Sequence, residues 1–291
     1  MYNILVTGVK GQLGSELQVL ASDFQDYEFF FTCASRLDIT EYSAVRKFIE
    51  KNHINCIINC AAYTAVDKAE TEVKTAEKVN TLAPKYLAEV AKDYHCKLVH
   101  ISTDYVFDGN NSRPYVETDI PNPQSVYGIT KLQGEKYIQE INPKETIILR
   151  TSWVYSKYGN NFVKTMLRLM SEKPQLSVID DQIGTPTWAK GLAEACVLAA
   201  ENKTAGVYHW TDEGVASWYD FAMAIQELGI EKGLLSSAIT VLPIPSSQYP
   251  TPAKRPHYSV LDKQTAREVF TSCKPAHWRK QLSDMLDDLK A

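Results

Sequence analysis

The feature that most constrains this sequence is a glycine-rich segment near its N-terminus. Residues 2–7 read as a short apolar strand, and residues 12–21 carry leucines at helical spacing. Between them, Gly8, Gly11 and Gly14 form a G-x-x-G-x-x-G pattern. In a first strand-to-helix turn, such glycines permit a tight turn, close approach of backbone to a pyrophosphate and close helix packing. We therefore predict a dinucleotide site at the helix N-terminus, with a plain glycine turn as the alternative.

Strands and helices alternate through the first half of the chain. Further strands are expected at residues 27–33, 55–60, 97–102 and 146–151, with helices at 41–52, about 66–94 and 124–140. Apolar strands separated by helices indicate a parallel sheet that is covered on both faces. The sequence therefore predicts an α/β fold with a doubly wound, Rossmann-like sheet.

The alternation becomes less regular after Trp153, which indicates a second, smaller C-terminal substrate lobe. Helices are expected near 160–172, 189–201 and 217–228, strands near 175–179 and 206–210, and a Pro-rich stretch at 243–256. We assign residues 1–153, with about 189–212 returning to them, to a dinucleotide-binding domain. The substrate-binding lobe is predicted to comprise about 154–188 and 213–291.

Composition and charge exclude several classes of protein. The formal net charge of -4 and the pI of about 5.9 argue against binding to nucleic acid or to an anionic membrane surface. No apolar run approaches the ~20 residues that span a bilayer, so we expect a cytoplasmic protein without a membrane partner. The six cysteines form no C-x-x-C pair and the six histidines no metal-ligand spacing, which predicts reduced thiols and no catalytic metal.

The residues after the second predicted strand bear on the choice of cofactor. An acid there binds the ribose 2′-OH of NAD, whereas an arginine suits the 2′-phosphate of NADP. Arg36, next to Ser35, favours NADPH, with NADH as the alternative. A solvated surface charge is the competing interpretation of Arg36.

A tyrosine and a lysine four residues apart supply a candidate acid–base pair. Tyr127 and Lys131 lie in the predicted helix 124–140 and therefore project from one face. A neighbouring ammonium favours the phenolate and lowers the pKa of a tyrosine. Tyr127 would donate a proton to a carbonyl oxygen as hydride reaches the carbon, and Lys131 would also bind the cofactor ribose. Because Y-x-x-x-K is common in helices, this interpretation depends on neighbouring motifs.

Polar residues follow the predicted strand 97–102 at the sheet edge where ligands of open α/β sheets bind. Thr103 is predicted to hydrogen-bond the substrate carbonyl and to stabilise the developing oxyanion. Asp104 is predicted to orient the sugar. A turn that ends the strand is the alternative interpretation of this pair. With the glycine loop, Thr103, Tyr127 and Lys131 resemble the catalytic set of a nicotinamide-dependent reductase of the extended short-chain dehydrogenase type.

Longer strings around these motifs resemble the dTDP-4-dehydrorhamnose reductase family. They are residues 8–14, Asn59–Glu70, Ser102–Gly109, Tyr127 with Lys131, Asp181–Thr187, Arg255–Pro256 and Ser259–Asp262. One departure is Cys60, which gives Asn-Cys-Ala-Ala where the family usually has Asn-Ala-Ala. The resemblance implies NAD(P)H-dependent reduction of the C4 keto group of dTDP-4-dehydro-L-rhamnose. The product would be dTDP-L-rhamnose, a precursor of cell-surface polysaccharide.

The resemblance also implies roles for individual residues. Thr103, Tyr127 and Lys131 would perform the chemistry, while Asp104 would contact the sugar and Trp153 would pack on it. The predicted lining of the cofactor site, glycines apart, comprises Gln12, Leu13, Asp38, Ile39, Ala61, Ala62, Tyr63 and Thr64. A tryptophan of the core is the competing interpretation of Trp153.

The two phosphates of a dTDP-linked 4-keto sugar need a local cation in this acidic protein. Arg255 is the candidate because its planar guanidinium matches phosphate oxygens, with a surface charge cluster as the alternative. Gln182 and Thr187 are predicted to shape the nucleotide pocket. Some family members are described as pairing through magnesium between acidic residues. This chain offers only Glu16 and Glu194 there, without an adjacent acidic pair beside Glu194, which weakens the case for a metal-linked dimer. The oligomeric state, a homodimer included, stays open.

Two other functions compete with a reductase. An epimerase or dehydratase that retains its cofactor would use the same tyrosine and lysine. A regulatory subunit would keep the fold merely to bind a dinucleotide, although the intact Thr103, Tyr127 and Lys131 set argues against it. The exact sugar nucleotide does not follow from the sequence.

Overall fold

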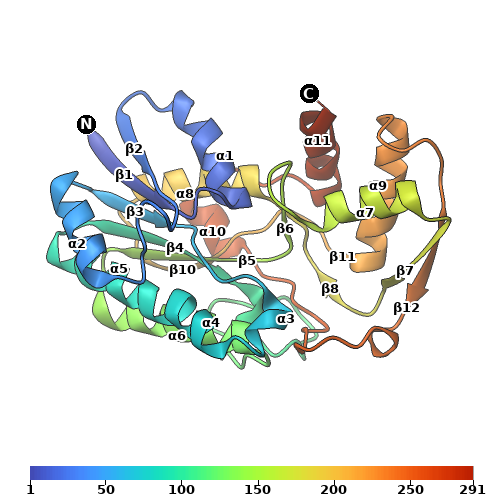
Figure 1. Cartoon of the computed structure of the whole chain (residues 1–291), viewed down its shortest axis with the longest axis horizontal. Coiled ribbons are helices and arrows are strands. Elements are labelled where there is room, and N and C mark those ends of the chain that lie inside the picture. The colour runs from blue at the N-terminus through green and yellow to red at the C-terminus, as the bar shows by residue number, and fades with distance from the viewer. Residues whose placement is uncertain (291) are drawn as a thin grey trace.

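The computed structural model describes residues 1–290 and has a six-stranded parallel sheet at its centre (Figure 1). The strands are β1 (Tyr2–Thr7), β2 (Tyr27–Phe31), β3 (Cys56–Asn59), β4 (Lys97–Thr103), β5 (Thr146–Thr151) and β10 (Gly206–His209). They lie in the order β10-β5-β4-β3-β1-β2. The predicted fold class is confirmed. Because β2 and β3 lie on opposite sides of β1, the strand order reverses there, and such a switch point is where open α/β sheets bind ligands.

Helices cover both faces of the sheet (Figure 1). They are α1 (Gln12–Leu20) and α8 (Ala189–Glu201) on one face, and α2 (Tyr42–Lys51), α5 (Ala83–Asp93) and α6 (Val126–Ile141) on the other. Successive side chains of a strand point to opposite faces. Ile4 and Val6 accordingly pack in the core with α1 and α8, whereas Leu5 packs in the core with α2 and α5. Burial on both faces explains why β1 reads as an unbroken apolar run.

The segment expected as one helix over about 66–94 is divided. It comprises α3 (Val66–Ala69), α4 (Val73–Glu77), a π-helical turn at Lys78–Leu82 and α5. The π-helical turn brings the side chain of Asn80 to the loop after β3, where it bonds the backbone of Tyr63. Single π-helical turns are frequent at functional sites, and this one supports a loop of the cavity described below.

A smaller lobe follows the carboxyl end of β5. Its helices are α7 (Phe162–Glu172), α9 (Trp218–Glu231) and α11 (Trp278–Lys290). Its paired strands are β6 (Val154–Tyr155) with β9 (Thr187–Trp188), β7 (Gln175–Ile179) with β12 (Thr240–Ile244), and β8 (Ile183–Gly184) with β11 (Ala216–Ser217). Tyr155, Phe221 and Leu282 are fully buried in its separate core. Neither β12 nor α11 was predicted from the sequence.

One C-terminal segment packs with the sheet and not with the lobe core. Helix α10 (Gln264–Val269) contributes Ala266 to the core of α1 and α8, and Phe270 joins it. The predicted domain boundaries stay a prediction.

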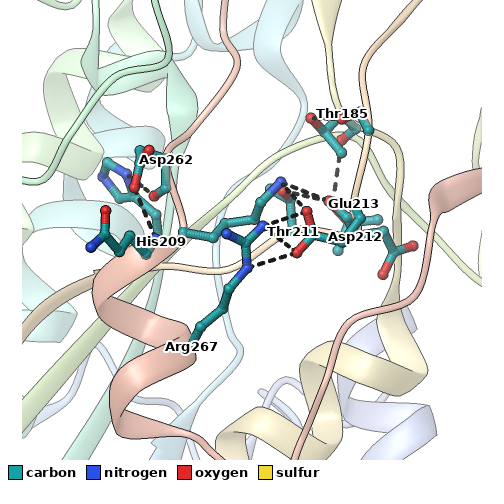
Figure 2. A network of polar contacts seen from close by, with 11 residues as sticks. Thr185, His209, Thr211, Asp212, Glu213, Asp262 and Arg267 are labelled. Atoms are coloured by element: carbon teal, nitrogen blue, oxygen red, sulfur yellow. Dashed lines mark hydrogen bonds and ion pairs between the residues drawn. The ribbon is translucent and has the colours of Figure 1, made fainter.

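A polar network lies beside this segment, at the junction of sheet and lobe (Figure 2). Glu213 accepts from Arg267 at 2.5 Å and lies 3.4 Å from the ammonium of Lys263. Lys263 also donates to the backbone carbonyl of Asp212 at 3.0 Å. These contacts join the segment that follows β10 to α10 and to the residue before it. Across residues 1–290, the helices are too short or too polar to cross a membrane.

Candidate active site

A cavity of about 880 Å³ lies at the carboxyl edge of the sheet. Its wall is formed by the loops that follow β1, β2, β3, β4 and β5, together with α6. The predicted residues that line it are Gly8, Gly11, Gln12, Leu13, Gly14, Asp38, Ile39, Ala61, Ala62, Thr64, Thr103, Asp104, Tyr127, Lys131 and Trp153. The structure therefore brings the glycine loop and the acid–base pair to one cavity.

Backbone contacts explain the glycines after β1. Gly8 has a φ of +70°, and a Cβ there would lie 2.7 Å from the backbone nitrogen of Ala61. A Cβ at Gly14 would lie 2.5 Å from the carbonyl oxygen of Gly8. The N-cap residue of α1, Gly11, has no side chain that would occupy the first N–H groups of the helix. This backbone cradle at a helix N-terminus fits the pyrophosphate of a dinucleotide.

Two residues, one that supports this wall and one that lines it, were not predicted from the sequence. Asn80 accepts from the backbone N–H of Tyr63 at 2.8 Å and donates to the carbonyl of the same residue at 3.0 Å. It thereby fixes the loop after β3. Lys10 lines the cavity from within the glycine loop. Lys10 could have been predicted from the sequence, because it is a cation inside a predicted phosphate-binding loop. The contact of Asn80 could not, because it depends on the π-helical turn.

Helix α6 carries Tyr127 and Lys131 to the cavity from a tightly packed first turn. The hydroxyl of Ser125 caps the helix by accepting from the N–H of Gly128 at 3.2 Å. A Cβ at Gly128 would lie 2.2 Å from the carbonyl oxygen of Tyr105. Glycine at this position therefore lets the tyrosine and lysine approach the loop after β4 closely.

Burial dominates the electrostatics of the acid–base pair. It raises the pKa of Tyr127 to about 12, with the Thr103 hydroxyl opposing the shift and the Asp104 carboxylate adding to it. Burial also lowers the pKa of Lys131 to about 8, against the attraction of the Glu135 carboxylate. The expectation of a lowered pKa for Tyr127 is wrong for this structure, because burial raises it. The spacing of the two residues predicts a neighbouring ammonium, but it does not predict that the phenol is buried.

Thr103 and Asp104 lie side by side at the end of β4. The Thr103 hydroxyl donates to Asp104 Oδ1 at 3.0 Å and accepts from the N–H of Tyr105 at 3.2 Å. Burial raises the pKa of Asp104 to about 6, and hydrogen bonding by the hydroxyls of Ser259 and Thr103 opposes the shift. The pair forms a turn, as the alternative interpretation holds, and both residues also line the cavity.

Trp153 is held in an uncommon backbone conformation on the far side of the cavity. Its φ is +47°, which is a genuine outlier for a bulky residue. Its ring stacks on that of Trp218 with centroids 3.5 Å apart and an interplanar angle of 6°. A Cβ at Gly184 would lie 2.6 Å from the Trp153 ring. Trp218 and Gly184 therefore position this indole, a role that the sequence analysis did not assign to either.

Five predicted site residues lie outside the cavity wall, namely Arg36, Tyr63, Gln182, Thr187 and Arg255. Arg36 donates to the carbonyl of Phe31 at 3.1 Å. Tyr63 donates its phenolic proton to Glu72 at 2.7 Å. Both side chains therefore make hydrogen bonds within the protein. Because Arg36 and Tyr63 lie outside the cavity wall, their predicted roles in cofactor binding stay predictions.

Arg255 forms a bidentate ion pair. Its guanidinium donates to the two carboxylate oxygens of Asp67 at 3.0 and 2.8 Å. Asp67 also accepts from the backbone N–H of Ala253 at 3.2 Å. Because Asp67 follows β3 and Arg255 belongs to the Pro-rich stretch, the pair joins the dinucleotide side of the molecule to its C-terminal region. Gln182 and Thr187 are buried, and their predicted roles also stay open to test.

Glu16, considered above as a magnesium ligand, is engaged within the chain. It is buried, and its Oε1 accepts from the hydroxyl of Ser156 at 2.6 Å and from the indole N–H of Trp188 at 3.3 Å. These bonds tie α1 to the lobe. Within residues 1–290, the structure gathers no three His, Cys, Asp or Glu side chains at a spacing that would hold a metal ion.

The fold and the cavity together define an extended short-chain dehydrogenase/reductase. Residues 2–291 match the protein family described as the RmlD substrate binding domain. The chain is 43% identical to the dTDP-4-dehydrorhamnose reductase of Aggregatibacter actinomycetemcomitans, over 98% of each chain. It therefore belongs to the dTDP-4-dehydrorhamnose reductase family, whose members are oxidoreductases.

Solved structures of the family agree with this assignment. A dTDP-4-dehydrorhamnose reductase from Clostridium acetobutylicum is 42% identical, with a TM-score of 0.93 over 99% of this chain and 100% of that one. The enzyme from Bacillus anthracis, solved in complex with NADP, is 34% identical, with a TM-score of 0.90 and the same coverage. The fold is thus shared over its full length, lobe included.

Proposed function

We propose that this protein reduces the C4 keto group of dTDP-4-dehydro-L-rhamnose to dTDP-L-rhamnose with NADPH. The observation that carries the proposal is the joint lining of one cavity by the glycine loop, Thr103, Tyr127, Lys131 and Trp153. The names of its relatives supply the substrate, and the NADP complex of the Bacillus anthracis enzyme supports the cofactor. The cytoplasm is the proposed location, because the six cysteines are free thiols, as is usual there.

Bound NADPH supplies the hydride. Tyr127 gives its phenolic proton to the C4 oxygen, and its burial keeps the phenol protonated until the oxygen becomes basic. The Thr103 hydroxyl turns from Asp104 to donate to the same oxygen, and it stabilises the charge that develops there. These two hydroxyls and the cradle after β1 are held by different strands of one sheet, which fixes their separation.

Lys131 supports the proton donor from one turn further along α6. Its ammonium donates to the carbonyl of Ile101 at 2.5 Å and lies 3.3 Å from His100 Nε2. An ammonium has three N–H groups, so one is left for a ribose hydroxyl at the cavity. Its positive charge also stabilises the phenolate that Tyr127 becomes after proton donation.

The remaining contacts select the substrate. Asp104 accepts from a sugar hydroxyl, and the Trp153 ring packs on the apolar face of the sugar. Arg255 is the proposed ligand of the diphosphate, and it would exchange its contact with the Asp67 carboxylate for the phosphate oxygens.

The consumption of NADPH distinguishes this function from that of an epimerase. A reductase consumes NADPH in proportion to product, whereas an epimerase oxidises no net cofactor.

The test is an NADPH-oxidation assay with dTDP-4-dehydro-L-rhamnose and a panel of other nucleotide-linked 4-keto sugars. Tyr127→Phe should lower kcat by roughly two to four powers of ten, the range typical of general acid catalysis, and leave NADPH affinity unchanged. Tyr137→Phe, on the same helix but outside the cavity wall, is the matched control. Near-normal turnover by Tyr127→Phe, or wild-type protein that oxidises no NADPH, would refute the proposal.

A further inference from the structure

A chain of buried polar side chains leads from Lys131 into the sheet, and the proposed chemistry does not use it. His100 Nε2 lies 3.3 Å from Lys131 Nζ, and His100 Nδ1 lies 3.0 Å from Asn59 Nδ2. At the far end, the hydroxyl of Thr7 donates to Asn59 Oδ1 at 2.6 Å. All four residues are at most 2% exposed. Burying polar groups is costly unless they are bonded, so an unbroken chain in the sheet indicates a role.

The hydrogen-bonded side chains from Lys131 to Thr7 have two self-consistent arrangements of their protons. If Lys131 is an ammonium, it donates to His100 Nε2, so Nδ1 carries the imidazole proton and needs an acceptor, the Asn59 oxygen. If Lys131 is a neutral amine, it accepts from Nε2–H, and Nδ1 accepts from the Asn59 amide nitrogen. The two arrangements interconvert by a change of tautomer and a half-turn of the amide.

Thr7 is suited to end such a chain. A hydroxyl both donates and accepts, so it can pair with either end of the Asn59 amide. The other contact of Lys131, the carbonyl of Ile101, accepts from an ammonium or an amine alike. Of these two contacts, only the imidazole responds to the charge of the lysine.

We propose that His100 is a positioning residue that holds Lys131 at the cavity in both of its protonation states, with Asn59 and Thr7 matching the imidazole tautomer to the charge. The inference rests on the proposed function, in which Lys131 serves the proton donor. It explains how a lysine can stay in place while its charge responds to the proton that leaves Tyr127.

The other groups that face Lys131 cannot hold it in both of its protonation states. Glu135, from the same helix, is held in a buried ion pair with Arg150 at 2.7 Å. Burial raises the pKa of the Cys60 thiol, which therefore stays neutral. Tyr127 lies on the same helix face but interacts with Thr103 and Asp104. Burial and the charge of Lys131 lower the pKa of His100, which therefore stays a neutral imidazole that can change tautomer.

A direct test follows the wild-type protein by NMR as the pH is raised, with variants used only to assign signals. The ¹³Cε signal of Lys131, assigned by its loss in Lys131→Arg, reports the charge of the lysine. The ¹⁵N signals of His100, assigned by their loss in His100→Gln, report its tautomer. We expect the imidazole to pass from Nδ1–H to Nε2–H at the midpoint of the lysine titration. A tautomer that stays the same through that titration overturns the proposal.

Substitutions test the same link from the lysine. His100→Leu removes the partner of both states, but the ammonium loses the stronger, charge-assisted hydrogen bond. The midpoint of Lys131 should therefore fall by about one pH unit, a tenfold loss of proton affinity. His100→Gln, whose amide can also donate or accept, should restore most of it. The matched control is His209→Gln, another buried histidine, which should leave the midpoint in place. An unchanged midpoint in His100→Leu overturns the proposal, and the tautomer measurement decides if that variant does not fold.

The alkaline limb of the pH profile for NADPH oxidation should move with the midpoint of Lys131. The two hypotheses can fail separately. If the tautomer changes as expected but the wild-type protein oxidises no NADPH with any 4-keto sugar, the proposed function falls and the role of His100 stands. If turnover is normal and the tautomer is fixed, the role of His100 falls alone.

Discussion

The two walls of the cavity are built by different means. The dinucleotide wall is mainly backbone, in which Gly8 and Gly14 pack against main-chain atoms at distances that no side chain would allow. The sugar wall is made of side chains, with the ring of Trp153 placed between Trp218 and Gly184. The glycines of the first wall are encoded within one short loop and its helix, although Gly8 also packs against the backbone after β3. The second wall requires segments that meet only when the lobe folds.

The two walls also differ in how they accommodate an unusual backbone conformation. Gly8 adopts its φ of +70° without steric cost because it has no Cβ. Trp153 has a φ of +47°, which costs on the order of 1–3 kcal/mol and persists only when neighbours hold it. The contrast indicates that the dinucleotide wall adopts its backbone conformation without strain, while the sugar wall depends on packing from the lobe.

Among substitutions that test the difference between the two walls, the largest expected effect comes from damage to the backbone wall. In Gly8→Ala, the left-handed φ costs about 1–2 kcal/mol because alanine has a Cβ. The contact of that Cβ with the backbone adds an overpacking cost of about 1–3 kcal/mol. We expect NADPH affinity, measured by fluorescence titration, to fall roughly 100-fold. Gly233→Ala is the control, since Gly233 has a φ of +71° but nothing within 4 Å of its Cβ position. Wild-type affinity in Gly8→Ala would show that the loop adjusts freely and that the comparison is wrong.

A smaller effect, confined to the other wall, is expected from Trp218→Ala. Removing the stacked ring loses about 0.5–1.5 kcal/mol of aromatic contact and releases Trp153. The KM for the sugar nucleotide should rise up to about tenfold, with NADPH affinity unchanged. Near-ultraviolet circular dichroism should lose the signal of the stacked indoles, and Trp218→Phe should restore part of the KM. An equal loss of NADPH affinity would mean that the two walls are not independent.

The same contrast explains which parts of the site could be predicted from sequence. Gly8, Gly11 and Gly14 lie within one turn, and Tyr127 with Lys131 lies within one helical repeat, so local spacing was enough. The stack of Trp153 on Trp218 joins residues that are far apart in the sequence, and no periodic pattern links them. Local patterns register which residue types stand near one another along the chain but not which distant segments they meet.

The charges of the site show a second limit of the sequence. The spacing of Tyr127 and Lys131 indicated a lowered pKa for the tyrosine, but burial of both residues decides the sign. Burial is a property of the folded chain, because Tyr105, Thr103 and Asp104 reach Tyr127 from the end of β4. The parallel sheet itself followed from the alternation of apolar strands and helices, whereas β12, which contains Pro243, did not.

The smallest expected effect concerns the ion pair that spans the two sides of the molecule. Asp67→Asn removes the charge that holds Arg255, and a partly exposed pair of this kind contributes only about 0–1 kcal/mol to stability. If Arg255 binds the diphosphate, the variant should lower the KM for the sugar nucleotide a few-fold, because the competing carboxylate is gone. Asp119→Asn, which breaks the similar Arg113 pair elsewhere, is the control. An increase in KM in Asp67→Asn would instead mean that the pair shapes the sugar wall, so that this wall depends on the loop after β3.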